Sequence, residues 1–185
     1  MNCQELIFNL FAIYVVPKSE SKNWVGYPWN VPYDESVATI NLSQMGFAAG
    51  DGKTAFSKFI DKISTFRRFT SYDCGNAESN LVIYCDEQMS ASAKPKTQTA
   101  GLMWENTVKC TAIHPTSADI RAMADIMKEQ HDLILVSDEN DFFLLRTPEE
   151  AYKCEAGQQL GSGWRHDVQF TIQNCHGMQL IEIEN

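Results

Sequence analysis

The segment Leu6–Val16 constrains the fold most, because ten of its eleven residues are apolar or aromatic and only Asn9 is polar. A run of this length is too short to cross a bilayer as a helix and is typical of a strand buried on both faces of a sheet. Its flanks do not match a secretory signal, since Glu5 precedes it without any lysine or arginine and Pro17 follows it. We therefore expect a first strand that is buried on both faces, and no transmembrane helix in the chain.

Two further segments have the three- and four-residue periodicity of helices. The first is 54–69, whose apolar stripe is Phe56, Phe59, Ile60, Ile63, Phe66 and Phe69. The second follows Pro115, with Thr116 and Asp119 at capping-box spacing and a stripe of Ile120, Met123, Ala124, Met127 and His131. A short third helix is expected after Thr147-Pro148, where two acidic residues would lie at the positive end of the helix.

Short apolar runs between turn-forming residues predict the remaining strands. They are 37–42, 81–85, 107–113, a hairpin of 133–136 with 142–145, and a second hairpin of 168–172 with 178–183. The order of elements is too irregular for a doubly wound fold. We expect an α+β fold in a single domain, 1–185, with a largely antiparallel sheet, an aromatic and proline-rich loop at 17–36 and a flexible loop at 87–101.

The six cysteines do not form a recognised metal or redox motif, because no two are spaced Cys-x-x-Cys. Two Cys/His pairs, Cys110 with His114 and Cys175 with His176, have side chains of the right types for a site but no recognised ligand spacing. Cysteines this sparse favour reduced thiols and a cytoplasmic location, and the sequence predicts no metal and no cofactor.

The segment 46–54 resembles a phosphate-binding loop only in part. Five residues separate Gly46 from Gly52-Lys53-Thr54, whereas the loop that wraps phosphates has four. Two interpretations of Gly50–Thr54 therefore remain: a plain glycine turn, or a loop that binds an anion through its backbone N–H groups. Other catalytic motifs are absent as well, so an enzyme with a Cys/His site or a nucleotide-binding loop is the alternative function and not the leading one.

Charge is distributed unevenly along the chain. Of its net charge of −9, −8 belongs to residues 101–185, and residues 129–150 hold seven acidic residues against one basic residue. Such a run is either a solvated face or a surface that attracts a basic partner. In the second case, the charged partner-binding residues are Asp132, Asp138, Glu139, Asp141, Glu149 and Glu150.

Aromatic residues of the 17–36 loop offer apolar anchors for the same partner. Trp24, Tyr27 and Trp29 are of the types that contribute most to protein interfaces, although the burial preference of aromatic residues favours a loop that folds back onto one end of the core. The leading hypothesis is an acidic protein-binding module, in its most concrete form an inhibitor or immunity-type protein that neutralises a basic toxin or nuclease. Its acidity argues against direct nucleic-acid binding.

Overall fold

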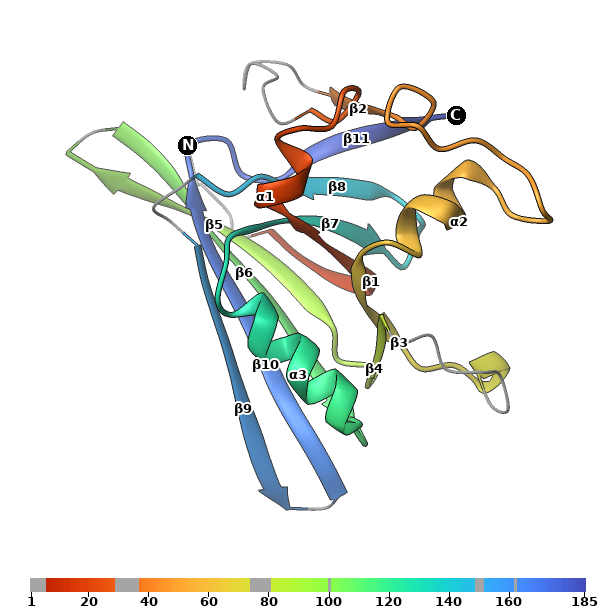
Figure 1. Cartoon of the computed structure of the whole chain (residues 1–185). Helices are drawn as coiled ribbons and strands as arrows, with labels where there is room; N and C mark the ends of the chain where they lie inside the picture. The colour runs from red at the N-terminus through yellow and green to blue at the C-terminus, as the bar shows by residue number, and fades with distance from the viewer. Residues whose placement is uncertain (1–5, 29–36, 74–80, 100, 149–151, 162) are drawn as a thin grey trace.

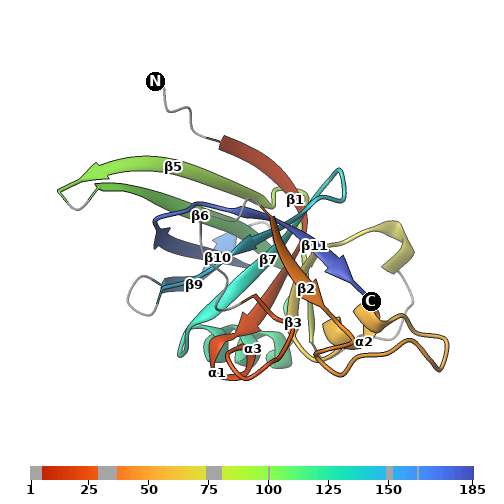
Figure 2. The same cartoon turned by 90° about the horizontal axis from the view of Figure 1, so that it is seen from above.

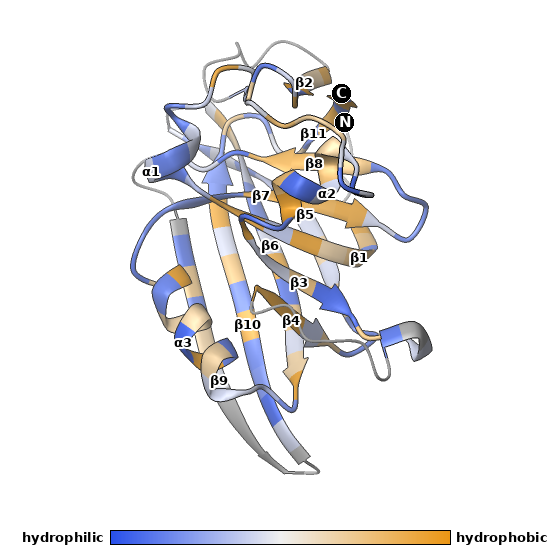
Figure 3. Ribbon diagram, turned by 45° about the vertical axis from the view of Figure 1, so that its right-hand side comes forward, coloured by the Kyte–Doolittle hydropathy of each residue, from blue (hydrophilic) through white to orange (hydrophobic). Residues whose placement is uncertain are grey.

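Strands β1 (Leu6–Pro17) and β7 (His131–Ser137) lie at the centre of the sheet. The computed structural model describes residues 6–28, 37–73, 81–99, 101–148, 152–161 and 163–185. Every residue of β7 is buried, and β1 is largely buried from Leu10 onward, whereas Ile7 is exposed. The expected buried strand is confirmed from Leu10 onward, and Figure 3 shows the apolar colouring of the neighbouring β7 and β8.

All the described strands belong to one mixed sheet of eleven strands (Figure 1). Its order is β2-β11-β8-β7-β1-β3-β4-β6-β10-β9, and β5 pairs with β1 and β6. The other strands are β2 (Val37–Asn41), β3 (Ser64–Arg68), β4 (Val82–Cys85), β5 (Ser90–Gln98), β6 (Gly101–Ile113), β8 (Phe142–Leu145), β9 (Tyr152–Gly161), β10 (Gly163–Asn174) and β11 (Gln179–Glu184). The helices are α1 (Lys18–Ser21), α2 (Ala55–Ile60), α3 (Ser117–Ile126) and the single 3-10 turn η1 (Ser71–Asp73).

One edge of β1 pairs with two different strands along its length. That edge pairs with β5 over Leu6–Asn9 and with β3 over Ala12–Val15, while the opposite edge pairs with β7 from Leu10 onward. Both branches reach β6, because β5 pairs with its first part and Cys85 of β4 pairs with Ala112. Seen from above, β5 and the β7–β8 turn lie on opposite sides of β1 (Figure 2).

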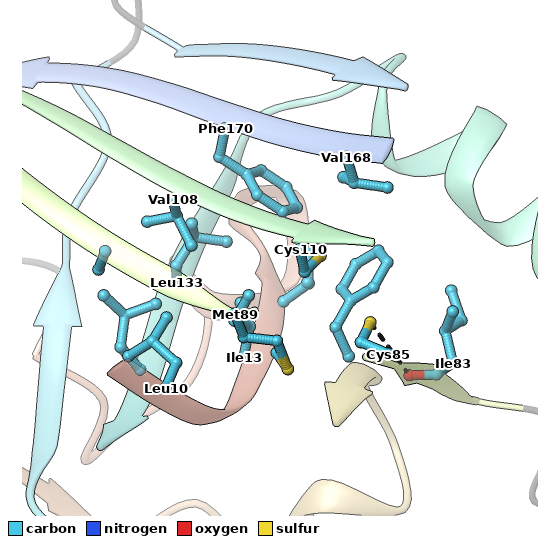
Figure 4. Close-up of a cluster of buried hydrophobic side chains, with 14 of the residues drawn as sticks. Leu10, Ile13, Ile83, Cys85, Met89, Val108, Cys110, Leu133, Val168 and Phe170 are labelled. Atoms are coloured by element: carbon cyan, nitrogen blue, oxygen red, sulfur yellow. Dashed lines mark hydrogen bonds between the residues drawn. The ribbon is translucent and has the colours of Figure 1, made fainter. Parts of the chain in front are cut away.

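Two apolar cores lie on the two faces of this sheet. Leu133 and Leu135 of β7 enter the first core, and Ile134 between them enters the second, as strand alternation requires. The first core lies among β1, β6 and β10 and is covered by α3 (Figure 4). The second core is covered by Phe59 of α2 and by Tyr27.

The expectation of an α+β fold with two main helices is wrong. The chain is 54% strand and 14% helical, and its helices are small. The predicted helix 54–69 ends at Ile60 and is followed by β3. Its apolar stripe serves both cores, since Phe59 and Ile63 pack in the second and Phe66 packs in the first.

The predicted flexible loop 87–101 is mostly strand β5. Ala91 and Ala93 are buried, and Ala91 packs in the first core. The partly exposed Ser90 and Ser92 alternate with them along the strand. Buried and less buried residues alternate here as in a strand, but alanine and serine differ too little in hydrophobicity for the sequence to show that alternation. Pro95 is accommodated because β5 pairs only with β6 beyond Ala93.

The second predicted hairpin does not form either. β10 pairs with β6 and β9, whereas β11 pairs with β8 and β2. Between them, the Asn174 Oδ1 accepts hydrogen bonds from the backbone N–H groups of His176 and Gly177, at 3.2 and 2.7 Å. This turn redirects the chain across the sheet instead of folding it back on itself.

The remaining elements are partly as expected. Helix α3 has the predicted capping box, in which the Thr116 hydroxyl and the Asp119 side chain each bond the other's backbone N–H. The hairpin of β7 and β8 is confirmed, with Leu133 opposite Leu145. His131 begins β7 and is not on the helical stripe. Thr147 and Pro148 are not helical, and residues 149–151, where the third helix was expected, lie outside the described residues.

Candidate functional site

The predicted acidic surface is divided between the two ends of β7. Asp132 lies near the start of the strand, and Asp138, Glu139 and Asp141 lie in the turn after its end. Six residues of extended chain span about 20 Å. Glu149 and Glu150, like Trp29, lie outside the described residues.

Asp132 is a buried structural carboxylate and not a surface charge. It is fully buried, and its two oxygens accept hydrogen bonds from the Thr147 backbone N–H at 2.8 Å and from the Tyr27 hydroxyl at 3.3 Å. Burial raises the pKa of Asp132, while the hydrogen bond from Thr147 and the charges of Lys18 and Arg146 oppose that shift. The prediction that Asp132 is a surface residue in contact with a partner is therefore wrong.

The aromatic residues that the structure describes pack onto the second core. Tyr27 is 5% exposed, and the half-buried Trp24 makes edge contacts with the rings of Tyr27 and Phe59 at centroid distances of 5.8 and 5.9 Å. Burial and the neighbouring Asp132 raise the pKa of Tyr27 well above its ordinary value. Trp24 and Tyr27 therefore cover one end of the core and lie away from the acidic turn.

Asp138, Glu139 and Asp141 remain exposed together at the β7–β8 turn. The Ser137 hydroxyl oxygen accepts the backbone N–H groups of Glu139 and Asp141, both at 3.2 Å, and Asn140 has a positive φ of 64°. These contacts fix the turn. One of its charges is paired, because an Arg68 Nη2 lies 2.8 Å from the Asp138 Oδ1.

A hollow of about 410 Å³ adjoins this turn. It is lined by Phe8, Asn9, Ser137, Asp138, Glu139, Asp141 and Phe143. The hollow lies beside the part of β1 that precedes its pairing with β7 at Leu10. We call this region, defined by its seven lining residues, the β1–β8 corner.

A smaller apolar pocket shares two walls with the corner. Its volume is about 140 Å³, and it is lined by Phe8, Ala93, Trp104, Phe143, His176, Gly177 and Met178. The rings of Phe8 and Phe143 lie between the two hollows, with their centroids 5.2 Å apart. Gly177 lies against the Trp104 indole with a φ of +67°, a backbone conformation that would be strained for a residue with a side chain. Phe8, Phe143 and Met178 also pack on the first core, which therefore opens to solvent at this pocket.

A third, more polar hollow of about 630 Å³ meets the corner at Asn9. Among its lining residues, Glu87 and Asp167 are acidic and Lys109 is basic. The Thr111 hydroxyl donates a 2.8 Å hydrogen bond to Asp167. Acidic side chains therefore line both hollows, which meet at the uncharged Asn9.

The two Cys/His pairs noted in the sequence differ in their surroundings. Cys110 is 2% exposed within the first core, where burial and the nearby Cys85 thiol raise its pKa well above the ordinary value, so the thiolate needed for attack is disfavoured. His114 is exposed beyond the end of β6. Cys175 is exposed, while His176 lines the apolar pocket.

The segment Gly50–Thr54 forms a tight turn and not a phosphate-binding loop. Gly50 and Lys53 bond each other's backbones at 3.0 Å, and the Lys53 Nζ lies 2.5 Å from Asp61. The Thr54 hydroxyl caps α2 by accepting the Ser57 backbone N–H. Within the described residues there is no cluster of three or more His, Cys, Asp or Glu side chains that could hold a metal ion.

Sequence reasoning found the acidic turn but missed the rest of the corner. Phe8 and Asn9 fall within the predicted buried strand, and Trp104 of the adjoining apolar pocket precedes the predicted strand 107–113. The polar Asn9 inside an apolar run was the available signal that this part of β1 leaves the core. No described helix is long and apolar enough to cross a membrane.

Comparisons with known proteins give no relative of this chain. No family model matches it, and neither a curated protein nor a solved structure shows significant similarity.

Proposed function

We propose that this protein is an acidic protein-binding module that receives basic side chains of its partner at the β1–β8 corner. In its most concrete form it is an inhibitor that neutralises a basic toxin or nuclease by covering its active site. The observation that carries the proposal is the group of three exposed carboxylates, Asp138, Glu139 and Asp141, beside a hollow of about 410 Å³.

Two features of the corner support the view that its acidic residues bind a partner and are not simply a solvated face. The backbone of the turn is held by hydrogen bonds to Ser137, so less ordering of the turn is needed when a partner binds. The hollow also has the aromatic walls Phe8 and Phe143, against which the apolar stem of a lysine or arginine can pack. Within the part of the chain that the structure describes, Glu139 and Asp141 form no ion pair, so they are the charges that we expect to attract a partner.

Charge reversal tests the proposal. Wild-type protein and the Glu139→Lys/Asp141→Lys variant are compared for association with lysine-rich peptides and with a panel of small basic nucleases, whose activity is also measured. We expect the variant to associate about tenfold more slowly at low salt, with little change in dissociation, because rim charges act mainly on the association rate. A nuclease that the protein inhibits should lose activity stoichiometrically.

The matched control is Asp125→Lys/Glu182→Lys, which changes the net charge equally at two exposed positions on α3 and β11. Asp125 pairs only with the exposed Lys128 among the described ion pairs, so this change should leave the fold intact. The control variant should associate within about twofold of wild type. Equal slowing by both variants, or association that does not respond to salt, would contradict the proposal.

A further inference from the structure

The apolar pocket beside the β1–β8 corner has the size of one aromatic side chain. Its volume of about 140 Å³ is close to the roughly 150 Å³ of a protein cavity that binds benzene. Five of its lining residues are Phe8, Ala93, Trp104, Phe143 and Met178, which offer ring faces, a methyl group and a thioether to an apolar guest. A charged guest would lose hydration against this mainly apolar lining, in which His176 is the one ionisable side chain among the described residues.

The arrangement of the two hollows limits what can fill both at once. Phe8 and Phe143 form a shared wall, with ring centroids 5.2 Å apart, so an apolar group on one side lies next to a basic group on the other. In an extended peptide, residues i and i+2 point to the same side and are about 6.6 Å apart. An aromatic residue followed two positions later by arginine or lysine can therefore direct both side chains to one side of the segment, toward two hollows that share the walls Phe8 and Phe143.

The edge of β1 at this place suits an extended guest. Its Leu6–Asn9 segment pairs with β5 on one side, and no described strand pairs with it on the other, where the ladder to β7 begins only at Leu10. An extended segment can be added to such an edge through its backbone, while alternate side chains enter neighbouring pockets. The hollow lined by Phe8 and Asn9 lies at this edge.

We infer that the partner presents an extended segment of the form aromatic-x-basic, whose aromatic ring fills the Phe8–Trp104–Met178 pocket while its basic side chain meets Glu139 and Asp141. This inference rests on the proposed function and specifies the chemistry of the partner. The apolar anchor supplies affinity by desolvation, and the charge supplies orientation and speed.

The test uses nine-residue peptides with blocked ends and the central sequences Phe-Thr-Arg, Ala-Thr-Arg and Phe-Thr-Glu. Binding to the full chain is followed by calorimetry and by the NMR signal of the Trp104 indole N–H, assigned with Trp104→Phe. We expect the Phe-Thr-Arg peptide to bind at least about tenfold more tightly than either control peptide and to shift the Trp104 signal.

A variant that fills the pocket checks the location. Ala93→Met places a longer side chain in the pocket wall and should abolish the advantage of Phe over Ala without changing binding of Ala-Thr-Arg. Equal binding of the two arginine peptides, no shift of Trp104, or no binding of any peptide would overturn the inference. Free phenethylamine that binds as tightly as the peptide would also overturn it, because the site would then be one for small molecules.

The two proposals fail in different ways. If arginine peptides bind with dependence on Glu139 and Asp141 but without preference for Phe, this inference is overturned and the proposed function stands. If the preference for Phe persists in the Glu139→Lys/Asp141→Lys variant without loss of affinity, the proposed function is overturned, and with it the basic half of the motif.

Discussion

Burial shifts the pKa values of two neighbours in β7 in opposite directions. His131 is 3% exposed and Asp132 is fully buried, and in each case burial favours the neutral form. The pKa of Asp132 is therefore raised, and that of His131 is lowered. Because these shifts arise on folding, each residue makes stability depend on pH.

Asp132 should make the protein less stable as pH rises. Its contribution is fully present below its ordinary pKa of 3.8 and is lost as pH rises through the raised value. We predict that the unfolding free energy falls with pH above 4 by at most about 1.4 kcal/mol per pH unit for this group, and that Asp132→Asn removes this component. Urea unfolding of both proteins from pH 4 to 8 measures it, and identical slopes would contradict the prediction.

His131 should act in the opposite sense. Its contribution is present above its ordinary pKa of 6.5 and is lost as pH falls toward the lowered value, since only the unfolded chain then takes up the proton. Nδ1 donates a 2.9 Å hydrogen bond to the Glu129 carbonyl oxygen, which opposes the shift caused by burial. We predict that His131→Gln loses less stability than wild type between pH 7.5 and 5.5 in the same unfolding assay.

The sequence does not distinguish Asp132 from Glu139, because both are acids in the same charged run. What separates them is the Thr147 backbone, fifteen residues away, which reaches Asp132 only once β7 and β8 have paired. Tyr27, from the far N-terminal part, adds the second contact. The number of charged residues along the chain predicts neither of these two contacts.

At the scale of elements, the sequence predicts a helix or strand correctly where contacts between residues close in sequence determine it. The capping box of α3 involves only Thr116 and Asp119, so the sequence was enough to place the start of this helix. In contrast, the stripe of 54–69 was split between α2 and β3, because Phe66 pairs with Ile13 of β1 in the sheet. Periodicity cannot separate helix from strand when tertiary pairing overrides it.

The cap of α3 provides a prediction at this scale. Thr116→Ala removes the side-chain acceptor for the Asp119 backbone N–H and should lower the unfolding free energy by about 1 kcal/mol. Asp125→Ala, on the exposed side of the same helix, should change it by less than about 0.5 kcal/mol. Chemical denaturation of the two variants checks the pair, and an equal effect would show that the cap is not the cause.

At the scale of the whole molecule, the sheet connects segments that are far apart in the chain. β2 pairs in parallel with β11, and β1 pairs with β3, β5 and β7. Pairings of this range leave no local trace in the sequence, so the order of strands could not be predicted from it. The same topology brings Phe8 and Phe143 together in the β1–β8 corner and places Trp104 in the apolar pocket beside it.

The location of binding is tested most directly by hydrogen–deuterium exchange of the full chain with and without the Phe-Thr-Arg peptide. The account predicts slower exchange at Leu6–Asn9 and at residues 137–143 in the bound protein, and unchanged exchange in α3. Protection confined to α3 or to the β2–β11 edge, with the β1–β8 corner unaffected, would contradict it.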